Sequence, residues 1–180
     1  MRQMIALIHR IGHRIDFAMD TPRRTLDRID FAILQELRND GRLSNKELAH
    51  RIGLAPSSCL ARFQRLQADG VITGFRAEIS VEALGVGLQS IISVQLDQHG
   101  LHAIEKVRDR LAALPEVSQL FHVGGSQDLL VHVGVTDPGH LLRFVTEHLS
   151  GHDDVKHIET ALLFEHLRSS VLPLPPETAT

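Results

Sequence analysis

Side chains that could contact a nucleic acid are concentrated in residues 44–70, SNKELAHRIGLAPSSCLARFQRLQADG. Ser57 and Ser58 supply hydroxyl groups, and Arg62 and Arg65 supply guanidinium groups. Such groups hydrogen-bond to phosphates and to the edges of bases. No Ser/His/Asp order, P-loop or nucleotide-binding glycine pattern accompanies them. The stretch therefore favours nucleic-acid binding over catalysis.

Two short helices joined by a tight turn are expected to position these groups. Ser44 and Glu47 have the spacing of a capping box, so the first helix should begin at Ser44. Gly53 can end it in a left-handed conformation, and Pro56 suits the first turn of a second helix that continues to about residue 69. This arrangement is typical of a helix-turn-helix.

The second helix should bury one side, because its apolar residues Cys59, Phe63 and Leu66 recur at helical spacing. Arg62 and Arg65 are then expected on the exposed side, opposite Phe63. An alternative is that two arginines only form a solvated face. The residues predicted to bind DNA are Ser44, Asn45, Pro56, Ser57, Ser58, Arg62 and Arg65.

The segments flanking this unit complete a winged domain. Residues 27–39 have a helical apolar pattern, and Asp27 and Asp30 favour the positive end of that helix. Gly70 is a candidate helix cap, and residues 71–79, VITGFRAEI, are expected to form an extended wing.

The second half alternates strands and helices in the order βαββαβ, which predicts a ferredoxin-like α+β domain. Its expected strands are residues 90–96, 117–123, 129–135 and 155–167, and its expected helices are residues 101–114 and 138–149.

Charge divides the chain in a similar place. Residues 1–76 carry 13 basic and 8 acidic side chains, whereas residues 77–180 carry 6 and 14. A basic half joined to an acidic half suggests a nucleic-acid module attached to a domain of another kind. A single cysteine fits a reducing compartment, and no apolar run is long enough for a membrane helix. A cytoplasmic protein is expected.

Residues 26–74, from LDRID through GLAPSSCLARFQRL to VITG, closely resemble the N-terminal domain of the Lrp/AsnC (feast/famine) transcriptional regulators. The likeness continues to about residue 168. It implies a winged helix-turn-helix head, a sensing domain, and control of genes of amino-acid metabolism in response to an amino acid or a related metabolite.

The resemblance also implies an effector site in the turn Gly124, Gly125, Ser126, Gln127 and Asp128. Glycines let a ligand approach backbone amides, and Asp128 could bind an ammonium group. The alternative is an ordinary hairpin turn. Ser126, Gln127 and Leu129 depart from the commoner family residues, so the identity of the effector stays open.

These patterns divide the chain into an N-terminal extension (1–25), a DNA-binding domain (26–79), a linker (80–88), an effector and dimerisation domain (89–168) and a tail (169–180). Residues 1–18 are expected to be dispensable, with Met19 as a possible first residue.

Nine of the 12 histidines lie beyond residue 80, which raises the possibility of a metal site. His148 and His152 are four residues apart, but Gly151 should end the helix between them, and no further ligand has suitable spacing. No metal or other cofactor is expected, apart from an amino-acid effector.

Assembly is expected, because the strands carry apolar residues on both faces and one face would lack a cover. A second copy would supply it, which predicts a homodimer that assembles into tetramers or octamers and binds double-stranded DNA. Val131→Asp or Leu163→Asp should abolish both the assembly and the binding to DNA. The sequence leaves two other functions open. One is an effector-independent nucleoid-organising protein, and the other is an enzyme similar to siroheme decarboxylases.

Overall fold

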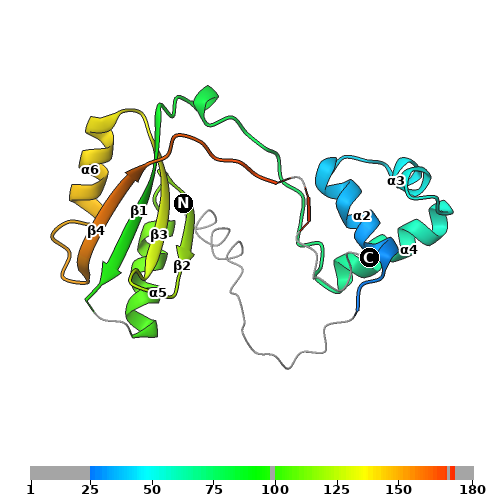
Figure 1. Cartoon of the computed structure of the whole chain (residues 1–180), viewed down its shortest axis with the longest axis horizontal. Coiled ribbons are helices and arrows are strands. Elements are labelled where there is room, and N and C mark those ends of the chain that lie inside the picture. Colours follow the sequence, from blue (N-terminus) through cyan, green and yellow to red (C-terminus); the bar gives the residue numbers. More distant parts are fainter. Residues whose placement is uncertain (1–24, 98–99, 170, 173–180) are drawn as a thin grey trace. The chain divides into compact units, whose positions relative to one another are not determined.

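The computed structural model describes residues 25–97, 100–169 and 171–172. The contacts divide the described chain into two compact units, residues 25–78 with 167–172 and residues 79–166 (Figure 1). Residues 1–24, to which the prediction of a dispensable extension applies, lie outside the described residues, as does most of the tail.

Three helices form the first unit: α2 (Arg28–Asn39), α3 (Asn45–Arg51) and α4 (Pro56–Ala68). Complete capping boxes begin α2, at Asp27, and α3, at Ser44. Gly53 has a φ of 69°, in the left-handed region that glycine adopts without strain, and it turns the chain from α3 into α4. The predicted helix-turn-helix is therefore confirmed.

A small apolar core holds these helices together. It consists of Ile33, Leu48, Ala49, Cys59 and Leu66, all at most 2% exposed. Cys59 and Leu66 thus lie on the buried side of α4, as predicted. Burial raises the pKa of the Cys59 thiol, so this cysteine is a packing residue.

The segment predicted to be an extended wing, residues 71–79, contains no strand. A strand needs a backbone partner, and the other regular elements of this unit are helices. The chain is held instead by side chains. The Phe75 ring stacks on Phe63 of α4, with the ring centroids 6.4 Å apart, and lies against Gly41.

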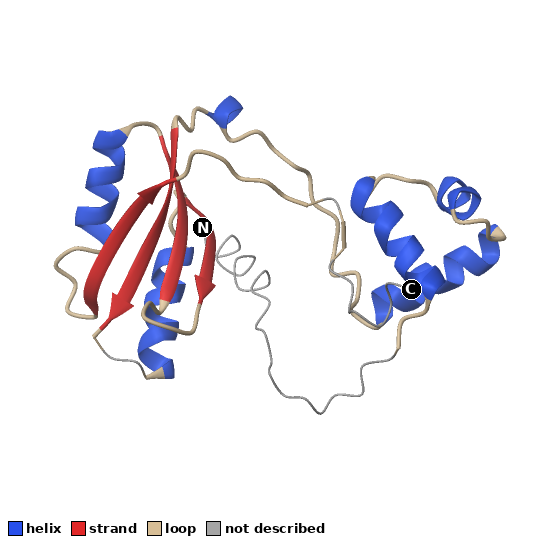
Figure 2. Ribbon diagram, in the orientation of Figure 1, coloured by secondary structure: helices blue, strands red, loops and turns tan. Residues whose placement is uncertain are grey.

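The second unit is a four-stranded antiparallel sheet with two helices (Figure 2). The elements follow the order βαββαβ, and the strand order across the sheet is β2-β3-β1-β4, which confirms the ferredoxin-like α+β fold. They are β1 (Leu88–Leu96), α5 (Leu101–Ala112), β2 (Val117–His122), β3 (Leu129–Val135), α6 (Pro138–His148) and β4 (Val155–Leu162); a 3-10 turn, η1 (Glu82–Leu84), precedes them.

The last strand ends earlier than predicted. β4 ends at Leu162, and the Leu163 N–H donates one more bond to the Gln89 carbonyl at 2.9 Å. Because β1 begins at Leu88, residues 164–167 have passed the end of their partner strand.

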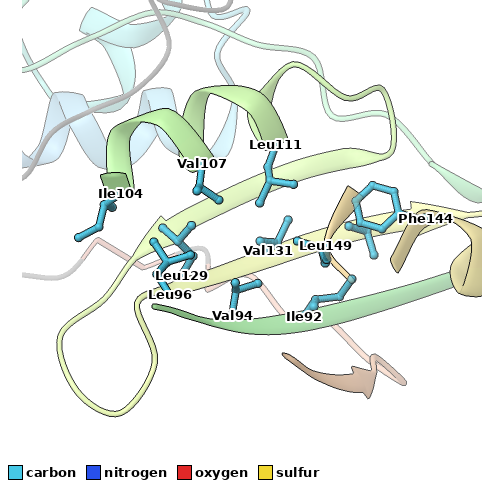
Figure 3. Close-up of a cluster of buried hydrophobic side chains, with 11 residues drawn as sticks. Ile92, Val94, Leu96, Ile104, Val107, Leu111, Leu129, Val131, Phe144 and Leu149 are labelled. Atoms are coloured by element: carbon cyan, nitrogen blue, oxygen red, sulfur yellow. The ribbon is translucent and has the colours of Figure 1, made fainter. Parts of the chain in front are cut away.

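One face of the sheet packs against both helices. Figure 3 shows Ile104, Val107 and Leu111 of α5 lying over this face, together with Phe144 of α6. The sheet contributes Ile92, Val94, Leu96, Leu129, Val131 and Val133 to the same core. Val131 is completely buried inside this unit, so its predicted place in a contact between subunits is wrong.

Among the described residues of this unit, no helix covers the opposite face. By the strand register, Ile91, Phe121, Leu130 and Leu163 lie on it beside polar residues. His132 is nevertheless only 6% exposed, because Gln89 and Ser118 hydrogen-bond to its ring and His166 packs against it. The apolar residues of this face are therefore interspersed with an ordered polar cluster.

Candidate nucleic-acid interface and effector site

Arg62 and Arg65 of α4 are turned toward α2. Arg62 Nη1 donates to Asp27 Oδ2 at 2.6 Å and to Asp30 Oδ1 at 2.9 Å. Arg65 Nη2 donates to Asp30 Oδ1 at 2.6 Å and to Oδ2 at 2.7 Å. The prediction that both arginines point away from the domain is wrong, since each forms an ion pair inside it.

The helical periodicity explains this orientation. Successive residues are about 100° apart around a helix, so Arg62 lies only about 40° from the buried Leu66. A long side chain at the margin of the buried face reaches back to the neighbouring helix when that helix offers an acid. Asp30 of α2 supplies this acid, and its side chain is only 2% exposed.

The four charges form a neutral cluster that holds α4 against α2. Its members, which we call the Asp30 cluster, are Asp27, Asp30, Arg62 and Arg65. The hydrogen bond from Arg62 is the main reason that the pKa of the Asp27 carboxyl is lowered, and the bond from the Asp30 N–H adds to it. Asp27 in turn raises the pKa of Arg62. Both arginines are thus matched by carboxylates.

The residues of α4 that face away from its buried side, which we call the exposed row, are uncharged. The sequence identified only some of them. Ser57, Ala61 and Gln64 recur at i, i+4 and i+7, and all three are exposed. Gln64 was missed because the prediction followed the arginines instead of the axis opposite Cys59 and Leu66. Pro56 and Ser58 are also exposed beside this row.

Ser44 and Asn45 are used within the helix-turn-helix. Besides the capping box, the Ser44 hydroxyl donates to Glu47 Oε2 at 2.6 Å, and this bond and the one from the Ser44 N–H lower the pKa of Glu47. The Asn45 amide donates to the Pro56 carbonyl at 2.9 Å and so joins the first turn of α3 to the first turn of α4. Contacts of either residue with DNA stay a prediction.

The predicted effector turn joins β2 to β3 and is hydrogen-bonded to the end of β1. Asp128 Oδ2 accepts from the Leu96 N–H at 2.8 Å, and the Asp128 N–H donates to the Val94 carbonyl at 3.0 Å. Asp128 therefore fixes the turn against β1, a role that the sequence did not suggest.

Other residues of the turn are open to a ligand. Gly124, Gly125 and Ser126 are exposed, and Gly125 has a φ of 137°, in a region that favours glycine. Gln127 is half-buried, and its Oε1 atom is buried without a hydrogen-bond partner among the described residues. A ligand N–H group would satisfy this oxygen once the Gln127 side chain turned it toward the surface.

The rest of the described surface offers weaker candidates. A hollow of about 570 Å³ is lined by His102, Lys106, His152 and Asp153, among others, and it includes no residue of the turn. Within the described ranges no group of three metal-binding side chains occurs. No helix in the described part of the chain is long and apolar enough to cross a membrane.

A helix-turn-helix unit followed by a ferredoxin-like domain with a glycine-containing turn defines a two-domain DNA-binding regulator. Residues 26–73 match the domain described as winged helix-turn-helix DNA-binding, and residues 89–172 match the Lrp/AsnC ligand binding domain. The chain belongs to the Lrp/AsnC family and is an effector-responsive DNA-binding transcriptional regulator.

Curated relatives match over most of their length. The HTH-type transcriptional regulator AldR of Mycolicibacterium smegmatis is 40% identical, over 84% of this chain and 88% of its own. The leucine-responsive regulatory protein of Rhizobium meliloti is 33% identical, over 82% of this chain and 95% of its own. These relatives are named as regulators, in contrast to the enzyme alternative.

A solved structure is similar over both domains. It is a transcriptional regulator from Neisseria meningitidis in complex with L-Met, with a TM-score of 0.74 and 32% identity over 84% of this chain and 97% of its own.

Proposed function

We propose that this regulator binds double-stranded DNA through the exposed row of α4 and responds to a free amino acid bound at the Gly124–Asp128 turn. The row would enter the major groove with Ser57, Ser58 and Gln64, whose hydroxyl and amide groups suit base edges. The Asp30 cluster would then set the angle of α4.

The observation that carries the effector proposal is the Gln127 oxygen. It is buried without a partner among the described residues, in a turn with exposed glycine amides. An amino acid has an ammonium group for such an oxygen and a carboxylate for backbone N–H groups. The L-Met complex of the Neisseria meningitidis regulator supports this class of ligand.

We further propose a cytoplasmic homodimer that assembles into tetramers or octamers. The support is the sheet face that carries Ile91, Phe121, Leu130 and Leu163, which a second copy could cover. Two copies would present two α4 helices to half-sites about one helical turn apart.

Footprinting of the purified protein on its own upstream DNA, with and without a panel of L-amino acids, tests the proposal. We expect a protected sequence whose extent or affinity changes with at least one amino acid. Protection that no amino acid alters, together with no thermal shift, would favour the nucleoid-organising alternative. A tetrapyrrole absorption band in the purified protein would support the enzyme alternative.

A further inference from the structure

The end of the described chain contacts the first helix of the DNA-binding domain. Arg38 Nη2, on α2, donates to the Ser169 carbonyl at 2.7 Å, and the Leu172 N–H donates to Gln35 Oε1 at 3.2 Å. Gln35 and Arg38 are three residues apart and therefore lie on the same side of α2. Two bonds to one side of a helix fix both the position and the direction of the segment.

The segment also has local order of its own. The Val171 N–H donates to the Ser169 hydroxyl oxygen at 3.1 Å, which links the two contact points. Leu172 is half-buried, although it follows the last strand by ten residues.

This contact gives the DNA-binding domain a second connection to the sheet. The first connection is the linker, which enters β1 at Leu88 and is held at its other end by the packing of Phe75 on Phe63. The second leaves β4 after Leu162. Because β1 and β4 are antiparallel neighbours, both connections leave the sheet at the same end, where the Leu163 N–H bonds to the Gln89 carbonyl.

The opposite end of β1 is bonded to the Gly124–Asp128 turn through Val94 and Leu96. A ligand that shifts this turn would therefore act on the strand that carries the linker and that pairs with β4. Movement of β1 against β4 would change the relative positions of the two connections.

We propose that α2 carries a docking surface, Gln35 and Arg38, for this chain's own C-terminal segment, Ser169 with Val171 and Leu172, and that the docked segment is a second tether that couples the effector domain to the DNA-binding domain. The docking stands on its own contacts, whereas the coupling rests on the proposed function.

Trypsin cleavage after Arg168 in the folded full chain tests the docking. A protease must bind several residues around the cut in extended form, and a segment bonded to α2 resists this. We expect the variant Arg38→Ala to release the C-terminal peptide several-fold faster than the wild type, measured by mass spectrometry. Arg28→Ala is the matched control, because it removes an exposed arginine from the same helix. Equal rates in all three proteins would overturn the docking.

Gln35→Ala provides a second measure, because alanine preserves the helix while it removes the acceptor of the Leu172 N–H. Exchange of that amide with deuterium should accelerate in Gln35→Ala and not in Arg28→Ala. Unchanged exchange would also contradict the docking.

Binding to DNA tests the coupling. In Arg38→Ala, the loosened tether should weaken binding to a duplex with two half-sites several-fold. Binding to a duplex with a single half-site should stay unchanged, because only two half-sites require a fixed arrangement of two α4 helices. Equal losses on both duplexes would instead mark Arg38 as a phosphate contact and overturn the coupling. A wild type that binds no DNA would contradict the proposed function, and the cleavage result would still decide the docking.

Discussion

Arg65 Nη2 donates to both carboxylate oxygens of Asp30, at 2.6 Å and 2.7 Å, and so joins α4 to α2. Asp30 is 2% exposed, whereas the Arg65 side chain is 32% exposed. The acid is thus the buried member of the pair, and two arginines contact it. Removal of its charge should affect the domain more than removal of a surface ion pair.

We expect Asp30→Asn to lower the stability of the DNA-binding domain by on the order of 3 kcal/mol, because it leaves Arg65 without a carboxylate and Arg62 with Asp27 as its partner. Amide hydrogen exchange in α2 and α4 of the full chain would measure this. Glu36→Gln is the control. Glu36 is on α2, like Asp30, and the substitution breaks its surface ion pair with Arg51 of α3, which should cost less than about 1 kcal/mol. Similar losses in both variants would show that the Asp30 cluster has no special role.

A fall in pH should weaken the Asp30 cluster, because protonation removes the negative charge of Asp27. Its folded-state pKa lies below its ordinary value of 3.8, so the folded protein binds fewer protons than the unfolded chain in this range. The contribution of Asp27 is therefore present above the unfolded pKa and is lost as the pH falls through the folded pKa. Between about pH 5 and pH 3, the stability of this domain should fall less steeply in Asp27→Asn than in the wild type. Equal slopes would contradict this assignment.

Local signals in the sequence were sufficient for most of the fold. The Ser44 and Glu47 capping box and the left-handed Gly53 depend on neighbours within a few residues, and the structure has both. The strand β3 is bounded as its alternating pattern predicted, at residues 129–135. The division of charge between the two halves and the resemblance to a family both indicated the two-domain arrangement.

The orientation of the arginines required information from a distant part of the chain. Arg65 and Asp30 are 35 residues apart, and only the packing of α4 on α2 brings them together. Periodicity marked Asp30 as the polar start of a helix and gave no sign that it would be buried. The bond from Leu96 to Asp128 is likewise formed between different strands, which a turn pattern does not specify.

Recognition of bases should depend on Gln64. If its amide makes a bidentate contact with a base, Gln64→Ala should cost about 1–3 kcal/mol on the operator and much less on random DNA. Fluorescence anisotropy titrations at fixed salt would measure both. Gln67→Ala is the matched control, because it changes the same residue type one turn further along α4. Equal effects of the two variants would place the base contacts elsewhere.

Substitution by Asp should have different consequences at the buried Val131 and at the half-buried Leu163. Val131 is completely buried between the sheet and its own helices, so Val131→Asp should destabilise the effector domain by on the order of 4 kcal/mol or more. Leu163 lies on the uncovered face, so Leu163→Asp should keep the fold and lose the oligomer. Circular dichroism and light scattering would separate the two outcomes. A Leu163→Asp protein with the wild-type mass would exclude this face as the interface.

The effector site should depend on the Gln127 acceptor. Gln127→Ala removes an oxygen that has no hydrogen-bond partner among the described residues, so the turn should keep its structure, while binding of the responsive amino acid should weaken by about 1–2 kcal/mol. Gln127→Glu keeps an acceptor and adds a negative charge, so binding of the ammonium group should be retained or strengthened. Asp128→Asn should instead disturb the turn itself, because the Leu96 N–H bonds to that carboxylate. Isothermal titration calorimetry would give the affinities, and an unchanged affinity in Gln127→Ala would place the ammonium group of the ligand elsewhere.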